Sequence, residues 1–511
     1  MAGTDESKER SCPGERYGIS LAICRTRQRN QYPKCLLCEH REVELAGSSA
    51  SDAKVAASIF RSSSVLGRVP EEINEYVMRK VGLAVAQFLR SENPAGSRMA
   101  VACDLRENSR GFTRIFCEGV TRAGTDAANV GAAPPDLLAF LLGTDAYMGA
   151  AFIGGGNYAD NVNGVRVWRK DGRGVGFGTG LEKVGLIARR LRMSSSRLPG
   201  QTTTVTPLAD YVAFMVKFAP KLRPLKVMVD AGSGGAGRLV KAIFEKLPIE
   251  LTPVNFEEDV QAAALGKKFP SSAMVSAART AVREARADFG AAFDFAGERI
   301  VFFDERGELL RHDVAAGLVA SEIIARNPEA CIVYDLRSTA ALRARITQRG
   351  GQPVSAPASR LAFTQQLRRS DALYGADLSG LHYFKSFFRF PSPFVALLML
   401  ASHVSRETEP VSKLTADLTR FSQGEEAVLP MPSAEAAEGV LANVRDACSD
   451  ADRELIDGVT VRHQDWWFNL RQPGKMAELR LVVEGRTSRE ERKGRQIVER
   501  MVQQALAAVK S

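Results

Sequence analysis

The sequence has no hydrophobic run long enough to cross a membrane. Its longest apolar stretch is Phe394–Ala401, whereas a membrane-spanning helix needs about 20 such residues, so we interpret this stretch as a buried helix. The N-terminal residues, MAGTDESKERSCPGERYG, also lack the apolar core of a secretion signal. These two absences predict a cytoplasmic protein that does not insert into a membrane.

Clusters of basic residues with interleaved aromatic residues are also missing. The 511 residues carry a formal net charge of +10, but Lys and Arg are spread along the whole chain. Nucleic-acid-binding domains concentrate such charge on one face or stripe, so the composition argues against a nucleic-acid partner. A basic cleft for a small anionic ligand fits the same net charge.

Cysteine is sparse outside the N-terminal segment, residues 1–50. Half of the eight cysteines stand in that segment, with a histidine close behind: Cys12, Cys24, Cys35, Cys38 and His40. The C-x2-C pair of CLLCEH is the short arm of many zinc sites, and a tetrahedral site needs four ligands of this kind. The segment therefore predicts a structural Zn²⁺ site built from Cys24, Cys35 and Cys38 with Cys12 or His40. The alternative is a tail with free thiols.

The remaining sequence alternates between strand and helix patterns. A length of 511 residues suggests three or four domains. Stretches such as RMAVACDL, LKVMVDAGSGGAGRLVKAIFEKL and ACIVYDL give strands separated by helices, which is typical of α/β units with mostly parallel sheets. The last ~90 residues change pattern, and we expect a smaller α+β domain there.

A glycine-rich turn offers one functional hypothesis. Gly232–Gly237 matches G-x-G-x-x-G between a strand and a helix, the dinucleotide-binding pattern. The acidic residue expected about 20 positions on fits neither Glu250 nor Glu257 well. A nucleotide-dependent enzyme is therefore one alternative, and a tight turn that needs glycine for packing is the other.

The stretch AFIGGGNYADNVNGVRVW, residues 151–168, has the outline of a catalytic loop but contains no Ser, Thr, Cys or His. Together with four further segments it resembles the α-D-phosphohexomutase family of phosphomannomutases and phosphoglucomutases. The stretch stands where that family has TASHNPxxYNGxK. IFRSSSVLGR resembles its opening FRxYDIRG segment, FDFAGERIVFF its metal loop DGDGDR, YGADLSGLHYF its sugar loop GEMSGHHYF, and WFNLRQPGKMAELRLVVEG its phosphate loop.

The resemblance implies an architecture. We expect three sequential α/β domains and a C-terminal α+β domain around a central cleft. The expected boundaries are 51–200 for domain I with the phosphoserine loop, 201–305 for domain II with the metal loop, 306–420 for domain III with the sugar loop, and 421–511 for domain IV with the phosphate loop.

The family transfers a phosphoryl group between the C1 and C6 oxygens of a hexose through a phosphoserine. Counted back from Asn163-Gly164, that serine falls on Gly156, and no neighbour offers a hydroxyl of similar reach. The family's lysine after Asn-Gly becomes Arg166, a poor proton donor because of its high pKa. Deleting a nucleophile costs several powers of ten in rate.

The resemblance also implies Mg²⁺, which prefers carboxylate oxygen ligands. Asp294 stands at the first ligand position of the metal loop, Ala296 at the second and Glu298 at the third. Each lost anionic ligand weakens binding because water must replace it. The sequence therefore predicts at most a weak, residual Mg²⁺ site.

The sugar and phosphate loops keep part of their chemistry. The family's acid/base histidine falls on Leu381, with His382 beside it, and leucine cannot transfer a proton. Proline and glycine replace phosphate-loop donors at 473–474, and proline has no N–H. The residues that the resemblance assigns to the sugar are Asp377, Ser379, Arg299 and Arg360, and those assigned to the phosphate are Arg471, Lys475 and Arg480.

The combined interpretation is a phosphohexomutase-like protein of carbohydrate metabolism that binds a hexose phosphate, or a protein partner, with phosphoryl transfer lost or strongly impaired. Two alternatives remain open: an active phosphomannomutase or phosphoglucomutase with an unusual site, and the nucleotide-dependent enzyme.

Overall fold

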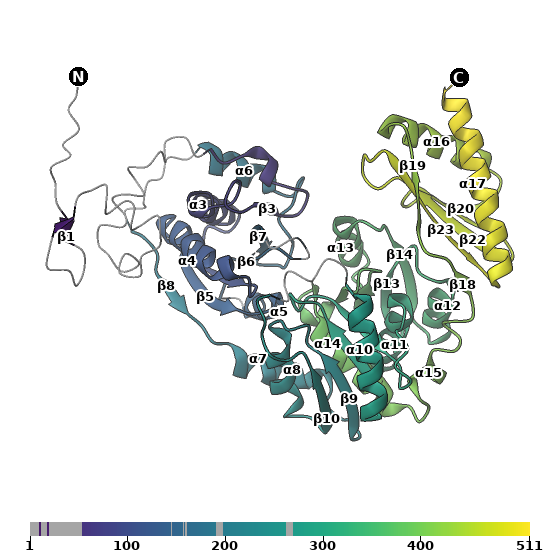
Figure 1. The fold of residues 1–511 in the computed structure, drawn as a ribbon, viewed down its shortest axis with the longest axis horizontal. Coiled ribbons are helices and arrows are strands. Elements are labelled where there is room, and N and C mark those ends of the chain that lie inside the picture. The colour runs from purple at the N-terminus through teal and green to yellow at the C-terminus, as the bar shows by residue number, and fades with distance from the viewer. Residues whose placement is uncertain are drawn as a thin grey trace.

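The computed structural model describes residues 10–11, 18–19, 54–144, 146–156, 158, 161–190, 198–261 and 269–510. In Figure 1 the chain passes through four sheet-containing units in sequence order. Three α/β units and a final unit of helices on an antiparallel sheet confirm the fold class expected from the sequence. The cysteines expected to hold zinc, Cys12, Cys24, Cys35 and Cys38, lie outside the described residues.

The first unit is a six-stranded mixed sheet in the order β3-β7-β6-β4-β5-β8. Its strands are β3 (Val65–Arg68), β4 (Arg98–Cys103), β5 (Asp126–Ala132), β6 (Gly149–Ile153), β7 (Val162–Arg169) and β8 (Thr202–Thr204), and its helices are α3 (Glu75–Glu92), α4 (Glu107–Arg122), α5 (Pro135–Leu142) and α6 (Leu181–Arg190). Along β4, Ala100 and Ala102 face one core while Met99 and Val101 face the other. A strand that is buried on both faces has a continuous run of apolar residues. This is why the sequence RMAVAC predicted a strand.

The second unit has four strands in the order β10-β9-β11-β12. These are β9 (Leu225–Asp230), β10 (Ile249–Val254), β11 (Phe289–Phe293) and β12 (Ile300–Phe303), with helices α7 (Leu208–Met215), α8 (Ala236–Phe244) and α10 (Ser272–Ala285). β11 and β12 pair antiparallel, Phe293 opposite Ile300. The loop between them, 294–299, is the expected metal loop, and the pairing places it at the edge where β11 ends.

The third unit has five strands in the order β14-β13-β15-β16-β17. The strands are β13 (Cys331–Asp335), β14 (Gln352–Ala356), β15 (Tyr374–Ala376), β16 (His382–Phe384) and β17 (Phe390–Pro391), and the helices are α11 (His312–Arg326), α12 (Ala340–Gln348), α13 (Arg360–Arg369), α14 (Pro393–Arg406) and α15 (Val411–Leu414). β15 and β16 pair antiparallel, so the expected sugar loop, 377–381, is the turn between them.

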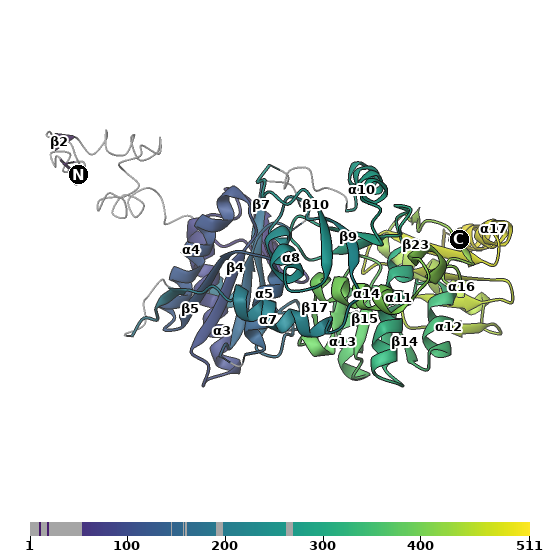
Figure 2. The same ribbon diagram turned by 90° about the horizontal axis from the view of Figure 1, so that it is seen from below.

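The fourth unit packs two helices on a six-stranded sheet. Its elements are β18 (Ser422–Gln423), β19 (Ala427–Pro430), α16 (Ala434–Ala447), β20 (Asp452–Glu454), β21 (Val459–Arg462), β22 (Trp466–Arg471), β23 (Glu478–Gly485) and α17 (Ser488–Lys510). Figure 2 shows α17 at the end of the molecule opposite the first unit. The turn between β22 and β23 carries the expected phosphate loop.

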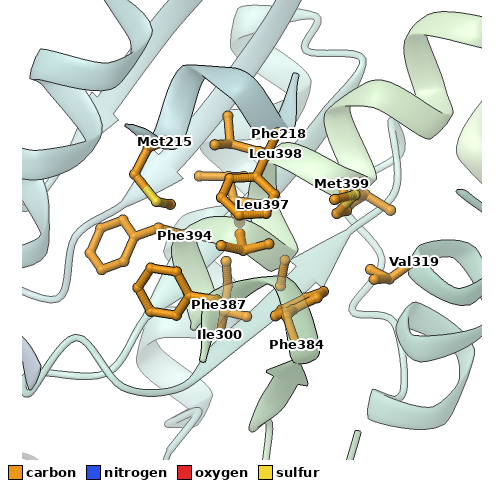
Figure 3. Close-up of a cluster of buried hydrophobic side chains, with 14 of the residues drawn as sticks. Met215, Phe218, Ile300, Val319, Phe384, Phe387, Phe394, Leu397, Leu398 and Met399 are labelled. Atoms are coloured by element: carbon orange, nitrogen blue, oxygen red, sulfur yellow. The ribbon is translucent and has the colours of Figure 1, made fainter. Parts of the chain in front are cut away.

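One hydrophobic core joins the first three units. Figure 3 shows Phe394, Leu397 and Leu398 of α14 beside Met215 of α7 and Phe218. Every residue from Phe394 to Ala401 is buried, so the apolar stretch is the buried helix that the sequence predicted. In the described part of the chain, no helix combines the length and apolarity needed to span a bilayer.

Candidate active site

The described part of the glycine loop after β6 includes Gly156, the position that the resemblance assigns to the phosphoserine. The carboxylate of Asp104 accepts the N–H of Gly155 at 3.0 Å, and a Cβ added to Gly154 would lie 2.5 Å from that carboxylate. Gly156 differs, because a Cβ there would meet nothing within 4 Å, although its φ is +56°. Close packing therefore requires the first two glycines, whereas Gly156 adopts a left-handed conformation that favours glycine.

A buried ion pair holds this loop in place. Arg106 Nε lies 3.1 Å from Asp104 Oδ2, and both side chains are at most 4% exposed. Arg106 Nη2 also donates to the carbonyl oxygens of Gly156 and Tyr158, each at 2.8 Å. The sequence analysis missed this pair, whose only signal is two charged residues directly after a buried strand. Arg106 therefore supports the described part of this loop through its backbone at Gly156 and Tyr158.

A second ion pair joins β7, the strand that follows the glycine loop, to the metal loop. Arg166, on β7, donates through Nη1 to Glu298 Oε2 at 2.6 Å and through Nη2 to Oε1. The two side chains are 21% and 13% exposed. Burial alone would raise the pKa of Glu298, but the guanidinium of Arg166, together with those of two neighbouring arginines, holds that pKa below its ordinary value. A cation from the first unit therefore neutralises the carboxylate that the resemblance assigns to the third metal-ligand position.

The other metal-loop residues offer little to a metal ion. Asp294 is 4% exposed, and its Oδ1 accepts the N–H groups of Glu298 at 2.8 Å and Arg299 at 3.1 Å. Burial and the neighbouring Glu298 charge raise the pKa of Asp294 to about 6. Ala296 has no donor atom, and the residues that the structure describes contain no group of three or more metal-ligating side chains. A hard cation needs several oxygen ligands, so these residues do not fit Mg²⁺.

The sugar loop is organised around its own aspartate. Asp377 Oδ1 accepts the N–H of Ser379 at 2.8 Å, the hydroxyl of Ser379 at 2.5 Å and the N–H of Leu381 at 3.3 Å. This local turn fixes the loop. It also uses one carboxylate oxygen that the resemblance assigns to sugar binding.

Leu381, which the resemblance aligns with the acid/base histidine, and the adjacent His382 are both buried. Leu381 is 2% exposed and packs in a cluster with Phe363 and Leu367 of α13. His382 is 1% exposed, and its Nδ1 lies 2.7 Å from the hydroxyl of Tyr374. Burial lowers the pKa of His382 to about 3. It is therefore a neutral core histidine.

The structure places another histidine against the sugar loop. His312, the first residue of α11, lies so close that a Cβ on Gly380 would be 3.0 Å from its ring. Burial lowers the pKa of His312 although the charge of Asp377 acts to raise it. No motif in the sequence marked His312 as a neighbour of this loop, since only the packing of α11 brings it there.

The phosphate-loop arginines are held by an internal carboxylate. Glu426, just before β19, accepts from Arg471 Nη2 at 2.9 Å, Arg480 Nη1 at 3.2 Å and Arg337 Nη1 at 3.2 Å. Burial alone would raise the pKa of Glu426, but these guanidinium groups lower it. Lys475 is exposed on the turn beyond them. Glu426 thus occupies the anion position among arginines that the resemblance assigns to a phosphate.

The metal and sugar loops lie together, whereas the phosphate loop forms a separate cluster with Arg337. The N–H of Ile300 donates to the carbonyl oxygen of Gly380 at 3.2 Å, which joins the first two loops. Arg299 lies close enough for its charge to act on Asp294, Glu298 and His312. Arg360, exposed at the start of α13, lines a cavity with Arg166 and Tyr383.

Backbone atoms of neighbouring residues occupy the space next to the glycine turn at 232–237. A Cβ on Gly234 would lie 2.0 Å from the carbonyl oxygen of Phe295, and one on Gly232 would lie 2.6 Å from that of Phe293. The metal loop therefore packs where a pyrophosphate would approach this turn. Close backbone packing explains these glycines, and the nucleotide hypothesis gains no support from the turn.

Comparison with known proteins agrees with the fold and the order of the loops. Family models of phosphoglucomutase/phosphomannomutase match the chain with alpha/beta/alpha domain I at 57–176, domain II at 209–307 and domain III at 312–421. The chain belongs to this family, the α-D-phosphohexomutases.

Individual relatives are distant but cover most of the chain. A phosphomannomutase of Vibrio cholerae serotype O1 is 25% identical over 447 residues, which is 84% of this chain and 94% of the relative. A family protein from Burkholderia thailandensis has a similar structure, with a TM-score of 0.77, 23% identity, and coverage of 88% of this chain and 98% of its own. An N-acetylphosphoglucosamine mutase of Aspergillus fumigatus, solved with GlcNAc-6P and magnesium, has a TM-score of 0.56 at 13% identity and covers 91% of this chain and 98% of its own.

Proposed function

We propose that this protein binds a hexose phosphate as its relatives do, but that its mutase phosphoryl transfer is lost or strongly impaired. The observation that carries the proposal is Gly156. A well-supported loop presents open space and no hydroxyl where the family's relay serine stands. A covalent relay without its nucleophile loses several powers of ten in rate.

The charge balance around the relay position supports the same conclusion. Phosphoryl transfer needs cationic groups directed at the transferring phosphoryl group. Here the guanidinium of Arg166 is engaged with Glu298, and the metal-loop residues do not fit Mg²⁺. No step of our proposal therefore uses a metal ion.

Ligand binding is proposed because the sugar loop forms an ordered turn and keeps the hydroxyl of Ser379. Asp377 holds Ser379 in the turn between β15 and β16, and Arg299 and Arg360 supply positive charge nearby. The structure of the fungal relative in complex with GlcNAc-6P supports a phosphorylated hexose as the ligand class. Arg471, Lys475 and Arg480 would receive its phosphate, and a cytoplasmic location and a role in carbohydrate metabolism belong to the same proposal. The N-terminal zinc site also stays a proposal.

Two assays on the full chain test this proposal. The first incubates it with mannose 1-phosphate or glucose 1-phosphate, a 1,6-bisphosphate activator and Mg²⁺, and measures the 6-phosphate product beside an active phosphomannomutase. We expect turnover several powers of ten below that control. A rate close to the control would establish the alternative, an active mutase with an unusual site.

The second assay measures binding by calorimetric titration with glucose 6-phosphate and, as a control, glucose. We expect heat from the phosphorylated sugar alone, weakened by Ser379→Ala but not by Ser386→Ala, a serine that is exposed outside the loop. Absence of binding in wild type would remove the hexose phosphate from the proposal and leave a role that depends on a protein partner.

A further inference from the structure

A cavity of about 650 Å³ lies between the first and third units, within the range of small-molecule sites. One wall is the loop 172–180 after β7, and the facing wall is one side of α13, where Arg360, Thr364 and Arg368 recur at helical spacing. Figure 1 shows α13 facing the first unit across the middle of the molecule. The cavity shares three residues with the candidate active site: Arg166, Arg360 and Tyr383. Four more of its residues, Ser62, Ser63, Val167 and Trp168, belong to segments that carry the family resemblance. The remaining lining residues lie outside those segments.

Positive charge dominates the lining. Two lining residues are acidic, Glu92 and Glu182, and eight are basic: Arg166, Arg169, Arg173, Lys183, Arg360, Arg368, Arg369 and Arg389. Like charges gathered along one cavity repel one another unless anions balance them, and water screens only part of this repulsion at the exposed Lys183 and Arg369. The lining therefore selects for an anionic occupant.

Internal carboxylates balance only part of this charge. Arg169 pairs with Glu92 at 2.7 Å and Arg173 with Asp171 at 2.6 Å, and Arg389 pairs with Asp371. Together with Arg166, which pairs with Glu298, four of the eight cations are therefore paired with a carboxylate.

Three further cations face the cavity without such a partner. Within the described ranges of the chain, Lys183, Arg368 and Arg369 form no ion pair with a carboxylate. Arg368 Nη2 donates only to the backbone carbonyl of Asp171, at 2.8 Å. Burial is the main cause that lowers the pKa of Arg368; the charges of neighbouring arginines add to it, and the Asp171 carboxylate acts to raise it.

The loop wall is built from alternating glycines. Every second residue from Gly172 to Gly180 is glycine, and all five line the cavity. Gly172, Gly178 and Gly180 have positive φ, and Gly176 approaches the carbonyl oxygen of Ser62, so local structure explains these four.

Gly174 is not explained in this way. Its φ is not positive, and an added Cβ would meet nothing within 4 Å. Its N–H donates to no acceptor in the part of the chain that the structure describes. A glycine at this position leaves a backbone donor uncovered at the cavity, as in loops that bind phosphate groups.

We propose that this cavity is a second ligand site that binds a compact anion carrying two or more phosphate groups. Lys183, Arg368 and Arg369 receive the charge from both walls, and the backbone of the alternating glycine loop contacts the phosphate oxygens. Because the walls belong to different units, the bound anion bridges the first and third units. This site shares Arg360 with the hexose phosphate proposal, but the cations that receive the anion here lie outside the sugar and phosphate loops.

Calorimetric titration of the full chain with inorganic tripolyphosphate tests the site. We expect binding to wild type that weakens about tenfold or more in Lys183→Gln/Arg369→Gln, since charge-assisted contacts are the strong ones. The matched control is Lys493→Gln/Arg492→Gln, which removes the same two charges from the exposed face of α17 and should bind as wild type does. Equal weakening by both double variants would overturn the proposal.

A second pair of variants tests the glycine loop without removing any cation. Gly174→Glu places a carboxylate in open space at the cavity and should abolish binding, whereas Gly111→Glu, also in open space but on α4, should not. Unchanged binding by Gly174→Glu would overturn the proposal. So would a comparable loss in Ser379→Ala, which would place the anion in the sugar loop, or equal affinity for orthophosphate, which would indicate a single phosphate.

Discussion

The ion pair between Arg166 and Glu298 should stabilise the contact between the first two units, and its removal is a direct test of the site geometry. Arg166→Gln leaves the Glu298 carboxylate largely buried without its cation. Removing one partner costs ~3–5 kcal/mol for a fully buried pair and ~0–1 kcal/mol for an exposed pair. Because the two side chains are 21% and 13% exposed, we place the cost of the lost pair at about 2 kcal/mol.

A smaller contribution comes from the rings beneath the guanidinium. Arg166 Cζ lies 5.1 Å from the ring centre of Phe152 and 5.4 Å from that of Trp168. Such contacts contribute ~0.5–1 kcal/mol at partly exposed sites. Arg166→Gln should therefore destabilise the protein by about 2–3 kcal/mol in total.

A double-mutant cycle separates the ion pair from these ring contacts. We expect Arg166→Gln and Glu298→Gln to show a coupling free energy of about 1–2 kcal/mol, measured by urea denaturation. The matched cycle uses Arg79 and Glu118, a pair within the first unit that is 20% and 34% exposed, for which we expect less than ~1 kcal/mol. Additive effects of Arg166→Gln and Glu298→Gln would refute the reasoning.

The Arg166→Gln variant also tests whether Arg166 keeps Mg²⁺ from binding at the metal loop. Without Arg166, Glu298 and Asp294 become two uncompensated carboxylates in one loop, a better though incomplete oxygen ligand set. Mg²⁺ should therefore raise the thermal midpoint of Arg166→Gln but leave that of wild type unchanged. An equal rise in both proteins would show that Arg166 does not exclude the ion.

Three further predictions address the phosphate loop, the relay position and the shared core. Glu426→Gln should strengthen phosphate binding about tenfold or more in calorimetric titration, since Arg471 loses its internal anion; unchanged affinity would contradict this. Gly156→Ser alone should not restore turnover, and intact-mass measurement after incubation with glucose 1,6-bisphosphate should show no added phosphate. Asp136 accepts a hydrogen bond from the hydroxyl of Tyr211 at 2.8 Å, and burial raises the pKa of Asp136 to about 8. The stability linked to this carboxyl group is therefore full below about pH 4 and is lost as the pH rises through about 8. Asp136→Asn should therefore gain in thermal midpoint relative to wild type above about pH 8, and a difference that does not change with pH would contradict the assignment.

Local sequence patterns were enough to predict the class of fold. The apolar runs of β4 and β9 and the glycine turn after β9 depend on neighbouring residues, because burial on both faces gives a continuous apolar run that can be recognised along the chain. The same holds for Phe394–Ala401, whose apolar residues have no polar face and therefore predict a buried helix. The identities of Gly156 and Ala296 also needed no structure, since a missing hydroxyl or carboxylate is a fact of composition.

What those residues contact was decided by tertiary structure. Arg166 and Glu298 are 132 positions apart. Glu426 meets Arg471 and Arg480 within the fourth unit, and it meets Arg337 through the packing of that unit on the third. An ion pair between loops has no sequence period, because its geometry depends on how separate sheets dock. The sequence by itself therefore determined the fold class and the absent reactive groups, while the docking of the units determined which charges neutralise one another and which remain to face a ligand.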